Sequence, residues 1–179
     1  MGEIRETDLS PKIRVAFGGM SLSEAAMISR HSKGMAVMPV FGRPREPEDQ
    51  INVFVLMPFK AKLEKVYTNH IKKMGEELGV TIRSADEIFS TRPFIEKVWE
   101  GICTAELVLA DCTERNPNVF YEIGMAHTVG KKVVLITRSD KDIPSDIKNF
   151  DYIPYIYDPE GVETLIEKLR TFLKSHFGL

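Results

Sequence analysis

From residue 51 onward, short apolar runs alternate with longer stretches in which apolar residues recur at helical spacing. The runs predict five strands, at Ile51–Leu56, Val80–Arg83, Leu107–Ala110, Val133–Ile136 and Tyr152–Tyr157. Strands that alternate with helices are typical of a parallel, doubly wound α/β sheet. We therefore expect a flavodoxin-like fold with strand order 2-1-3-4-5, whose switch point lies between the first and third strands.

The helical stretches carry their own start and stop signals. Gly79 ends the first helix, Ser90 or Thr91 can cap the second, and Gly130 ends the third. The predicted buried stripes are Leu63, Val66, Tyr67, Ile71, Met74 and Leu78 in the first helix, Phe94, Ile95, Val98, Trp99 and Ile102 in the second, and Val162, Leu165, Ile166, Leu169, Phe172 and Leu173 in the last.

Residues 1–50 do not continue this pattern, and we interpret them as an N-terminal extension and linker before a domain at 51–179. Gly42–Gln50 is rich in proline and charge, which favours an exposed connection. Two candidate strands, Ile13–Phe17 and Met35–Phe41, flank an amphipathic stretch at Leu22–His31. These could form an edge addition or an arm that reaches a partner subunit. About fifty residues bury little core alone, so the segment should lean on the main domain or on another copy.

The segment from Ala105 to Thr137 is the most informative for function. Its first strand ends in a carboxylate, Asp111, and Asn116 and Pro117 can cap and open the helix that follows. Glu122 lies less than two turns into that helix. Because ligand sites of parallel sheets lie beyond the carboxyl ends of the strands, Asp111 and Glu122 are both placed near such a site.

The predicted order of strands defines the walls of this site. One wall is the loop after the first strand, Met57, Pro58, Phe59 and Lys60. The opposite wall is Asp111 to Asn118 with the first turns of the Glu122 helix, and Ser84, Asp86 and Glu87 could form the rim. We expect Asp111, Asn118 and Glu122 to line one concavity with the loop at 57–60.

These residue types suit chemistry at an anomeric carbon. A helix N-terminus favours the ionised form of Glu122 by up to about 1 kcal/mol. A carboxylate in a partly apolar pocket can stabilise an oxocarbenium-like transition state or bond to it covalently. Asp111 could hold sugar hydroxyls or assist proton movement. Asn116 and Asn118 offer amides to hydroxyls or to a base edge, and Asn118 shares the helix face of Glu122.

Simpler interpretations stand beside these assignments. A glutamate in a helix is usually a solvated surface residue, and an aspartate at a strand end is commonly a turn or cap former. Trp99 and Phe94 are more typical of core residues than of base-stacking residues. Cys112 has no evident histidine partner, which favours packing. By default, we expect a solvated loop at Arg138, Lys141 and Asp142.

Composition narrows the class of protein. The chain has 179 residues, 43% of them hydrophobic, and a net charge of −2. This charge gives no global attraction to a nucleic acid polymer or to a membrane, and no apolar run approaches the length needed to span a bilayer. Two cysteines, Cys103 and Cys112, lack metal-ligand spacing. We expect a cytoplasmic protein without a metal or another cofactor.

The stretch YEIGMAHTVGKKVVLI, from Tyr121, resembles the E-(I/L)-G-x-A-x-x-x-G-K-x-V pattern of the nucleoside 2-deoxyribosyltransferase-like superfamily. The wider frame is similar to a branch of that superfamily related to TIR-like domains. It comprises VFVLMPF, ADEI, Ile102–Asp111, NPNVFYEIGMAH and IPSDIKNFDYIPY, so the resemblance covers about Ile51 to Leu173. It implies a flavodoxin-like fold, pockets for nucleosides or nucleotides, homo-oligomers, and Glu122 as the nucleophile.

Two positions depart from the pattern of that superfamily. Deoxyribosyltransferases have an aspartate shortly before the nucleophile, whereas this chain has Asn116, whose amide cannot act as a general acid. Relatives that cleave nucleoside monophosphates have a glycine- and serine-rich loop after the first strand, where this chain has Met57 to Lys60. Two functions therefore remain open. One is an N-glycosidase or glycosyltransferase acting on a nucleoside, a nucleotide or NAD, and the other is a non-catalytic nucleotide-binding signalling domain.

Overall fold

The computed structural model describes residues 39–42, 44, 50–88 and 91–179. The chain divides into two units, Met1–Arg45 and Glu46–Leu179. The expected elements Ile13–Phe17 and Leu22–His31 lie outside the described residues, as does most of Met35–Phe41. In the first unit, residues 39–42 form a turn in which the Gly42 amide donates to the Pro39 carbonyl at 3.0 Å. The strand predicted to reach Phe41 therefore does not include Val40 and Phe41.

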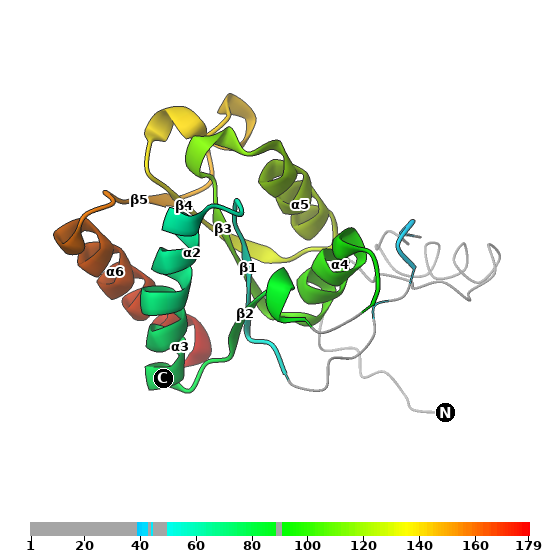
Figure 1. Ribbon diagram of the computed structural model, residues 1–179, viewed down its shortest axis with the longest axis horizontal. Helices are drawn as coiled ribbons and strands as arrows, with labels where there is room; N and C mark the ends of the chain where they lie inside the picture. Colours follow the sequence, from blue (N-terminus) through cyan, green and yellow to red (C-terminus); the bar gives the residue numbers. More distant parts are fainter. Residues whose placement is uncertain (1–38, 43, 45–49, 89–90) are drawn as a thin grey trace, which may run out of the picture. The chain divides into compact units, whose positions relative to one another are not determined.

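The second unit is built on a five-stranded parallel sheet with the order β2-β1-β3-β4-β5, which confirms the predicted fold class (Figure 1). The strands are β1 (Val53–Leu56), β2 (Ile82–Ser84), β3 (Leu107–Asp111), β4 (Lys132–Thr137) and β5 (Tyr152–Pro154). All residues of the central strands β1 and β3 are buried, as continuous apolar runs in a doubly covered sheet require. The order places the carboxyl ends of β1 and β3 at the switch point.

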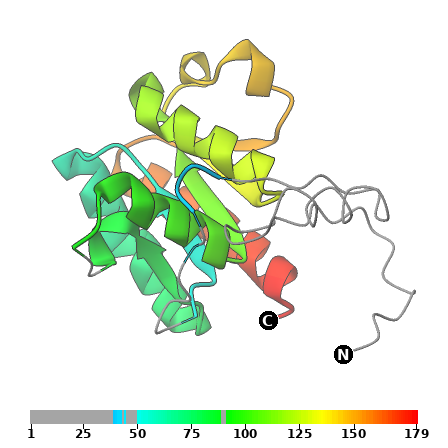
Figure 2. The ribbon, with the colours of Figure 1, turned by 90° about the vertical axis from the view of Figure 1, so that its right-hand side faces the viewer.

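Helices cover both faces of the sheet (Figures 1 and 2). On one face lie α2 (Ala61–Val66), η1 (Tyr67–Ile71), α3 (Lys72–Leu78) and α6 (Pro159–Phe177). On the other face lie α4 (Phe94–Thr104) and α5 (Pro117–Thr128). Short 3-10 turns follow the strands at η2 (Ala85–Glu87), η3 (Thr113–Arg115), η4 (Asp140–Asp142) and η5 (Ser145–Ile147). None of the helices in this described part combines the length and apolar character needed to cross a bilayer.

Most helix boundaries agree with the sequence signals. Gly79 ends α3 in the left-handed conformation, at φ 69°. The first helical stretch, however, is not a uniform α-helix, because Tyr67–Ile71 forms a π-helical turn between α2 and α3. The second helix begins at Phe94 with Pro93 as its N-cap, so the predicted cap at Thr91 is wrong, while Ser90 lies outside the described residues. Pro93 has no amide hydrogen and sets an extended start, which moves the helix boundary toward Phe94.

The layer of α4 approaches the sheet closely at one glycine. A Cβ atom added to Gly101 would lie 2.2 Å from the Phe54 ring, and Phe54 is fully buried in β1. Glycine fits at position 101 because it has no Cβ atom, whereas the Cβ of any other residue would clash with the Phe54 ring. This contact sets the depth at which α4 lies on the sheet, and so the position of the α4 N-terminus beside the switch point.

Candidate functional site

The β3–α5 connection forms as the sequence predicts. The Asn116 side-chain oxygen accepts a hydrogen bond from the backbone amide of Asn118 at 2.9 Å, and Pro117 occupies the first turn of α5. The Asn116 amide group is thereby used as a helix cap. Asn118 is exposed at the start of the helix. These contacts fix where α5 begins, and therefore how far Glu122 lies from the carboxyl edge of the sheet.

Glu122 is buried, with 8% of its surface exposed, on the side of α5 that also buries Val119, Ile123 and Ala126. Its carboxylate has no hydrogen-bond or ion-pair partner among the residues that the structure describes. Burial raises the pKa of this carboxyl group from 4.5 to about 7. The expected dipole effect, up to about 1 kcal/mol in favour of the ionised form, is smaller than this desolvation and does not decide the charge state.

The surroundings of the Glu122 helix come from four elements. This helix, α5, packs against α4 in the same layer and against β1, β3 and β4 of the sheet. Both carboxylate oxygens lack a partner yet neither is fully enclosed, because the described residues contain no solvent-inaccessible side-chain oxygen or nitrogen without a hydrogen bond. The Glu122 carboxylate is thus largely desolvated, although its oxygens keep some contact with solvent.

Asp111 occupies a different environment. It is 4% exposed, and its carboxylate accepts hydrogen bonds from the Thr113 amide and the Tyr155 hydroxyl, each at 2.9 Å. Burial is the largest influence on this carboxyl group and raises its pKa. Tyr155 belongs to the core layer of α2, α3 and α6, whereas Glu122 lies in the opposite layer. No hydrogen bond joins Asp111 to Glu122 within the described ranges.

The loop after β1 meets the loop after β3, as expected for the two walls of the switch point. Met57 and Pro58 are buried, while Phe59 and Lys60 are exposed. The Lys60 ammonium group forms an ion pair with the carboxylate of Glu114 in η3. Glu114 lies within the predicted wall, Asp111 to Asn118, but was not singled out, because a glutamate in a polar loop has no distinguishing sequence signal.

An aromatic pair stands at the same edge. The rings of Phe59 and Phe94 meet edge to face, with centroids 5.2 Å apart. Phe59 is 52% exposed and Phe94 is 42% exposed, so the prediction of Phe94 as a core residue is wrong. Phe94 is the first residue of α4, where a side chain projects beyond the layer rather than into it. The proline directly before Phe94 was the sequence signal that could have identified Phe94 as the exposed first residue of the helix.

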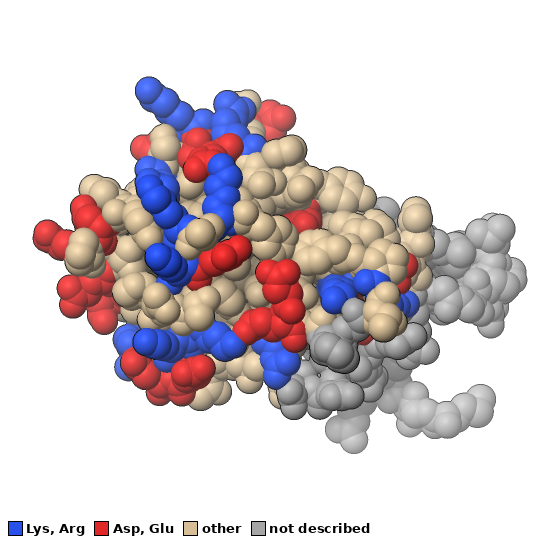
Figure 3. Space-filling view, viewed as in Figure 1, with Lys and Arg blue, Asp and Glu red and all other residues tan. Residues whose placement is uncertain are grey.

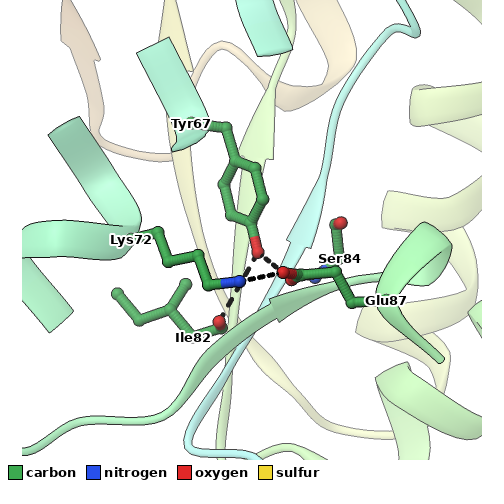
Figure 4. Close-up of polar contacts among 5 residues, drawn as sticks. All are labelled: Tyr67, Lys72, Ile82, Ser84 and Glu87. Atoms are coloured by element: carbon green, nitrogen blue, oxygen red, sulfur yellow. Dashed lines mark hydrogen bonds and ion pairs between the residues drawn. The ribbon is translucent and has the colours of Figure 1, made fainter. Parts of the chain in front are cut away.

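The rim after β2 is held by a half-buried glutamate, Glu87. The Glu87 carboxylate accepts hydrogen bonds from the Tyr67 hydroxyl, the Lys72 ammonium and the Ser84 amide, the last at 3.1 Å (Figure 4). Burial opposes its ionisation, but these donors hold the pKa of Glu87 below its ordinary value. Tyr67 reaches the carboxylate from the π-helical turn. Of the three predicted rim residues, Ser84 and Glu87 belong to this cluster, and Asp86 is exposed beside it.

A cavity of about 320 Å³ opens beyond the carboxyl ends of β3, β4 and β5. Its lining residues are Thr113, Glu114, Arg138, Ser139, Asp142, Tyr155, Ile156 and Tyr157. Asp111, Asn118 and Glu122 do not line it, so their shared concavity stays a prediction. Arg138 and Asp142 were expected in an ordinary solvated loop, but both face this cavity, because the loop after β4 turns back over the sheet edge.

Other potentially reactive side chains serve packing. Cys112 is fully buried, and burial raises the pKa of its thiol. His127 stacks on Phe150, with ring centroids 4.7 Å apart. In the part of the chain that the structure describes, no group of three or more His, Cys, Asp or Glu side chains is arranged to hold a metal ion.

Comparison with known proteins places the fold. No family model matches the chain, and no curated protein matches its sequence. The TIR domain of the Toll-related receptor TRR-2 from Hydra magnipapillata matches with a TM-score of 0.52 and 10% identity, over 65% of this chain and 92% of its own. The CMP N-glycosidase BcmB of Clostridium botulinum matches with a TM-score of 0.53 and 20% identity, over 68% of this chain and 98% of its own.

A 2-deoxyribosyltransferase from Bacillus psychrosaccharolyticus matches with a TM-score of 0.40 and 18% identity, over 59% of this chain and 99% of its own, which is too low to carry an argument. The first two similarities show that the chain shares its fold with the TIR domain and with the CMP N-glycosidase. The fold implied by the sequence motifs is therefore confirmed. At these identities the similarity concerns the fold alone, and the function must be argued from the site.

Proposed function

We propose that the chain is an N-glycosidase or glycosyltransferase that acts on a nucleotide or an NAD-like substrate, with Glu122 as its nucleophile or cation stabiliser. The observation that carries this proposal is the state of Glu122. It is a buried carboxylate in the second turn of α5, without a partner in the described residues and with a pKa raised to about 7. A structural carboxylate at such a depth is normally satisfied by hydrogen bonds.

The desolvation of Glu122 matches the charge that develops in glycosyl transfer. As the bond between the anomeric carbon and the base breaks, positive charge builds up on the sugar ring. A carboxylate that has lost its water interacts with this charge more strongly than a solvated carboxylate would. The substrate cation also lowers the pKa of Glu122, so binding itself promotes the ionised, reactive form. The fold match to a CMP N-glycosidase supports the same reaction class.

The substrate class follows from the absence of a general acid at Asn116. Its amide cannot protonate a leaving base, and it is already engaged in capping α5. A base that leaves as a neutral molecule from a cationic glycoside, such as the nicotinamide of NAD, needs no proton. We therefore favour NAD-like or otherwise activated nucleotides over unmodified purine deoxynucleosides.

The steps balance without a cofactor. The electron pair of the glycosidic bond leaves with the base, and a Glu122 oxygen forms a bond to the anomeric carbon or stabilises the cation. Water or another hydroxyl then attacks that carbon, the bond to Glu122 breaks, and the proton of the attacking group passes to solvent. In this scheme Asn118 and the exposed Phe59–Phe94 pair contact the sugar and the base. Asp111 positions Thr113 and Tyr155 rather than reacting.

The test is product analysis by chromatography after incubation with NAD, CMP, and unmodified nucleosides and deoxynucleosides. Wild type should release free base from NAD or a nucleotide, and Glu122→Gln should remove turnover while keeping the fold. Asn116→Asp should extend turnover to bases that need protonation, because an aspartate can cap the helix and also donate a proton. Turnover that survives Glu122→Gln would exclude this mechanism.

The second candidate is a non-catalytic nucleotide-binding signalling domain, which the fold match to a TIR domain favours. It becomes the better description if wild type releases no base from any member of the panel but binds a nucleotide tightly. The Glu122→Gln variant separates the two again. A sensor would keep or gain affinity when the buried carboxylate is neutralised, whereas an enzyme would lose turnover.

A further inference from the structure

The reaction proposed above assigns no role to the cavity of about 320 Å³ beyond β3, β4 and β5. Its volume is within the range of small-ligand sites. It combines a cation, Arg138, with hydroxyl groups from Thr113 and Ser139 and with apolar surface at its rim. Ile156 is 69% exposed there, next to Tyr157.

One cation, Arg138, lines this cavity, and two more, Lys62 and Lys60, lie beside its lining residues Tyr157 and Glu114. The guanidinium of Arg138 lies 5.3 Å from the centre of the Tyr157 ring, and the Lys62 ammonium lies 6.0 Å from the same centre. The third cation, Lys60, is held next to the cavity by its ion pair with the lining residue Glu114. In Figure 3, lysine and arginine side chains gather, with acidic side chains between them, where α2 and the neighbouring loops lie in Figure 1. Arg138 itself has no ion pair with any described residue.

Glu114 stands in the middle of these cations. The hydrogen bond from Lys60 is the largest influence that lowers the pKa of its carboxyl group, and the charges of Lys60, Arg138 and Lys62 act in the same direction. Glu114 and Arg115 both adopt positive φ, 64° and 54°, a conformation that residues other than glycine rarely adopt. The Glu114 amide is held there by the carboxylate of Asp142, at 2.9 Å. The loop thus holds an internal carboxylate against the cations at the mouth of the cavity.

We propose that this cavity binds a phosphate monoester, with Arg138 and Lys60 as its anion ligands and Glu114 as an internal anion that the phosphate displaces. Half of the Glu114 side chain is exposed, so it can swing into solvent without unfolding its surroundings. The departing carboxylate leaves Lys60 free for the phosphate, while Arg138 offers the forked donors that match phosphate oxygens. The sugar or base of the ligand would lie against Tyr157 and Ile156.

A bound metal cation fits this cavity less well. Its two lining carboxylates are already engaged, Glu114 with Lys60 and Asp142 with the Glu114 amide, and neither is oriented with a third acidic ligand in the described residues. The proposal does not depend on the glycosidase reaction, since it concerns binding alone.

Calorimetric titration of the full chain with AMP and adenosine, and with CMP and cytidine, tests this proposal. Each monophosphate should bind about tenfold or more tightly than its nucleoside, because the phosphate adds charge-assisted hydrogen bonds. Arg138→Gln should remove that preference. Glu114→Gln should tighten monophosphate binding several-fold, because it removes the competing carboxylate while leaving the nucleoside unaffected. Increasing salt should weaken only the monophosphate.

Matched controls are Lys168→Gln and Glu163→Gln, which make the same charge changes at exposed positions of α6 and should alter neither affinity. Equal affinity for monophosphate and nucleoside, or weaker monophosphate binding by Glu114→Gln, would overturn the proposal. If turnover is found, a rise in KM for phosphorylated substrates alone in Arg138→Gln identifies the phosphate as the substrate's own. An unchanged KM in Arg138→Gln, together with loss of AMP binding, identifies a ligand other than the substrate. If no turnover is found, the binding titrations decide by themselves.

Discussion

Replacing Glu122 with glutamine should make the protein more stable above neutral pH. Burial raises the pKa of Glu122 from 4.5 to about 7, so the folded state favours the neutral carboxyl group. A group whose pKa is higher in the folded state contributes its stability fully below the unfolded pKa, and loses it as the pH rises through the folded pKa. The wild type therefore loses stability from about pH 4.5 to about pH 7, and glutamine, which is always neutral, does not.

The magnitude follows from the same two pKa values. The difference between 4.5 and about 7 corresponds to about 3 kcal/mol in the free energy of unfolding, at 1.36 kcal/mol for each pH unit. Because Glu122 is only 8% exposed, little of this is screened by solvent. At pH 8.5 the glutamine variant should exceed the wild type by about 3 kcal/mol more than it does at pH 4.5.

Urea unfolding at four or five pH values between 4.5 and 8.5 measures this difference directly. Glu163→Gln, at an exposed position of α6, controls for the change in net charge and should show no such dependence. A difference between Glu122→Gln and wild type that stays constant across the range would refute the reasoning. It would mean that the Glu122 carboxylate is as well stabilised in the fold as in water.

Three further predictions concern activity, packing and assembly. If the proposed reaction is correct, kcat/KM should rise with pH through about 7, because the free protein must ionise Glu122 before it can act. A pH-independent profile on the acid side would argue against an ionised nucleophile. Gly101→Ala should destabilise the fold by about 1–3 kcal/mol in urea unfolding because its Cβ would lie 2.2 Å from the Phe54 ring, whereas Gly124→Ala, with open space in α5, should gain up to about 1 kcal/mol. Light scattering should report a homo-oligomer, and a species of 20.3 kDa at high micromolar concentration would contradict this expectation.

The sheet could be predicted from sequence because its signals are local. Buried parallel strands appear as continuous apolar runs, and Asn116–Pro117 and Gly79 mark helix ends by their own chemistry. The helix start at Phe94 was missed because a serine or threonine a few residues earlier resembles a cap equally well. The π-helical turn at Tyr67 was also missed, and the hydrogen bond of Tyr67 to Glu87 joins residues twenty positions apart, which no local pattern indicates.

The candidate site was predicted in outline only. Strand order determines which loops meet, so the approach of the loop at 57–60 to the loop after β3 could be inferred, and the Lys60–Glu114 ion pair joins them. The directions of side chains could not be inferred with the same certainty. Asp111 and Glu122 are eleven positions apart at one sheet edge, yet Asp111 bonds to Tyr155 in one core layer and Glu122 is buried in the other. Successive side chains of a strand point to opposite faces of the sheet, so the face that Asp111 takes depends on its exact position at the end of β3.

Asp111 and Glu122 are both buried carboxylates, and their partners predict opposite responses to neutralisation. Asp111 accepts hydrogen bonds from the Thr113 amide and the Tyr155 hydroxyl, and an asparagine there can accept from only one of them. Asp111→Asn should therefore cost about 1–3 kcal/mol at neutral pH, because it leaves a buried donor unsatisfied. Tyr155→Phe should recover part of that loss in the double variant, since it removes one of the two donors. Glu122 has no such donors, so its neutralisation should stabilise the fold while ending turnover. Equal and same-signed effects of the two substitutions in urea unfolding at pH 8 would show that the two carboxylates do not differ in this way.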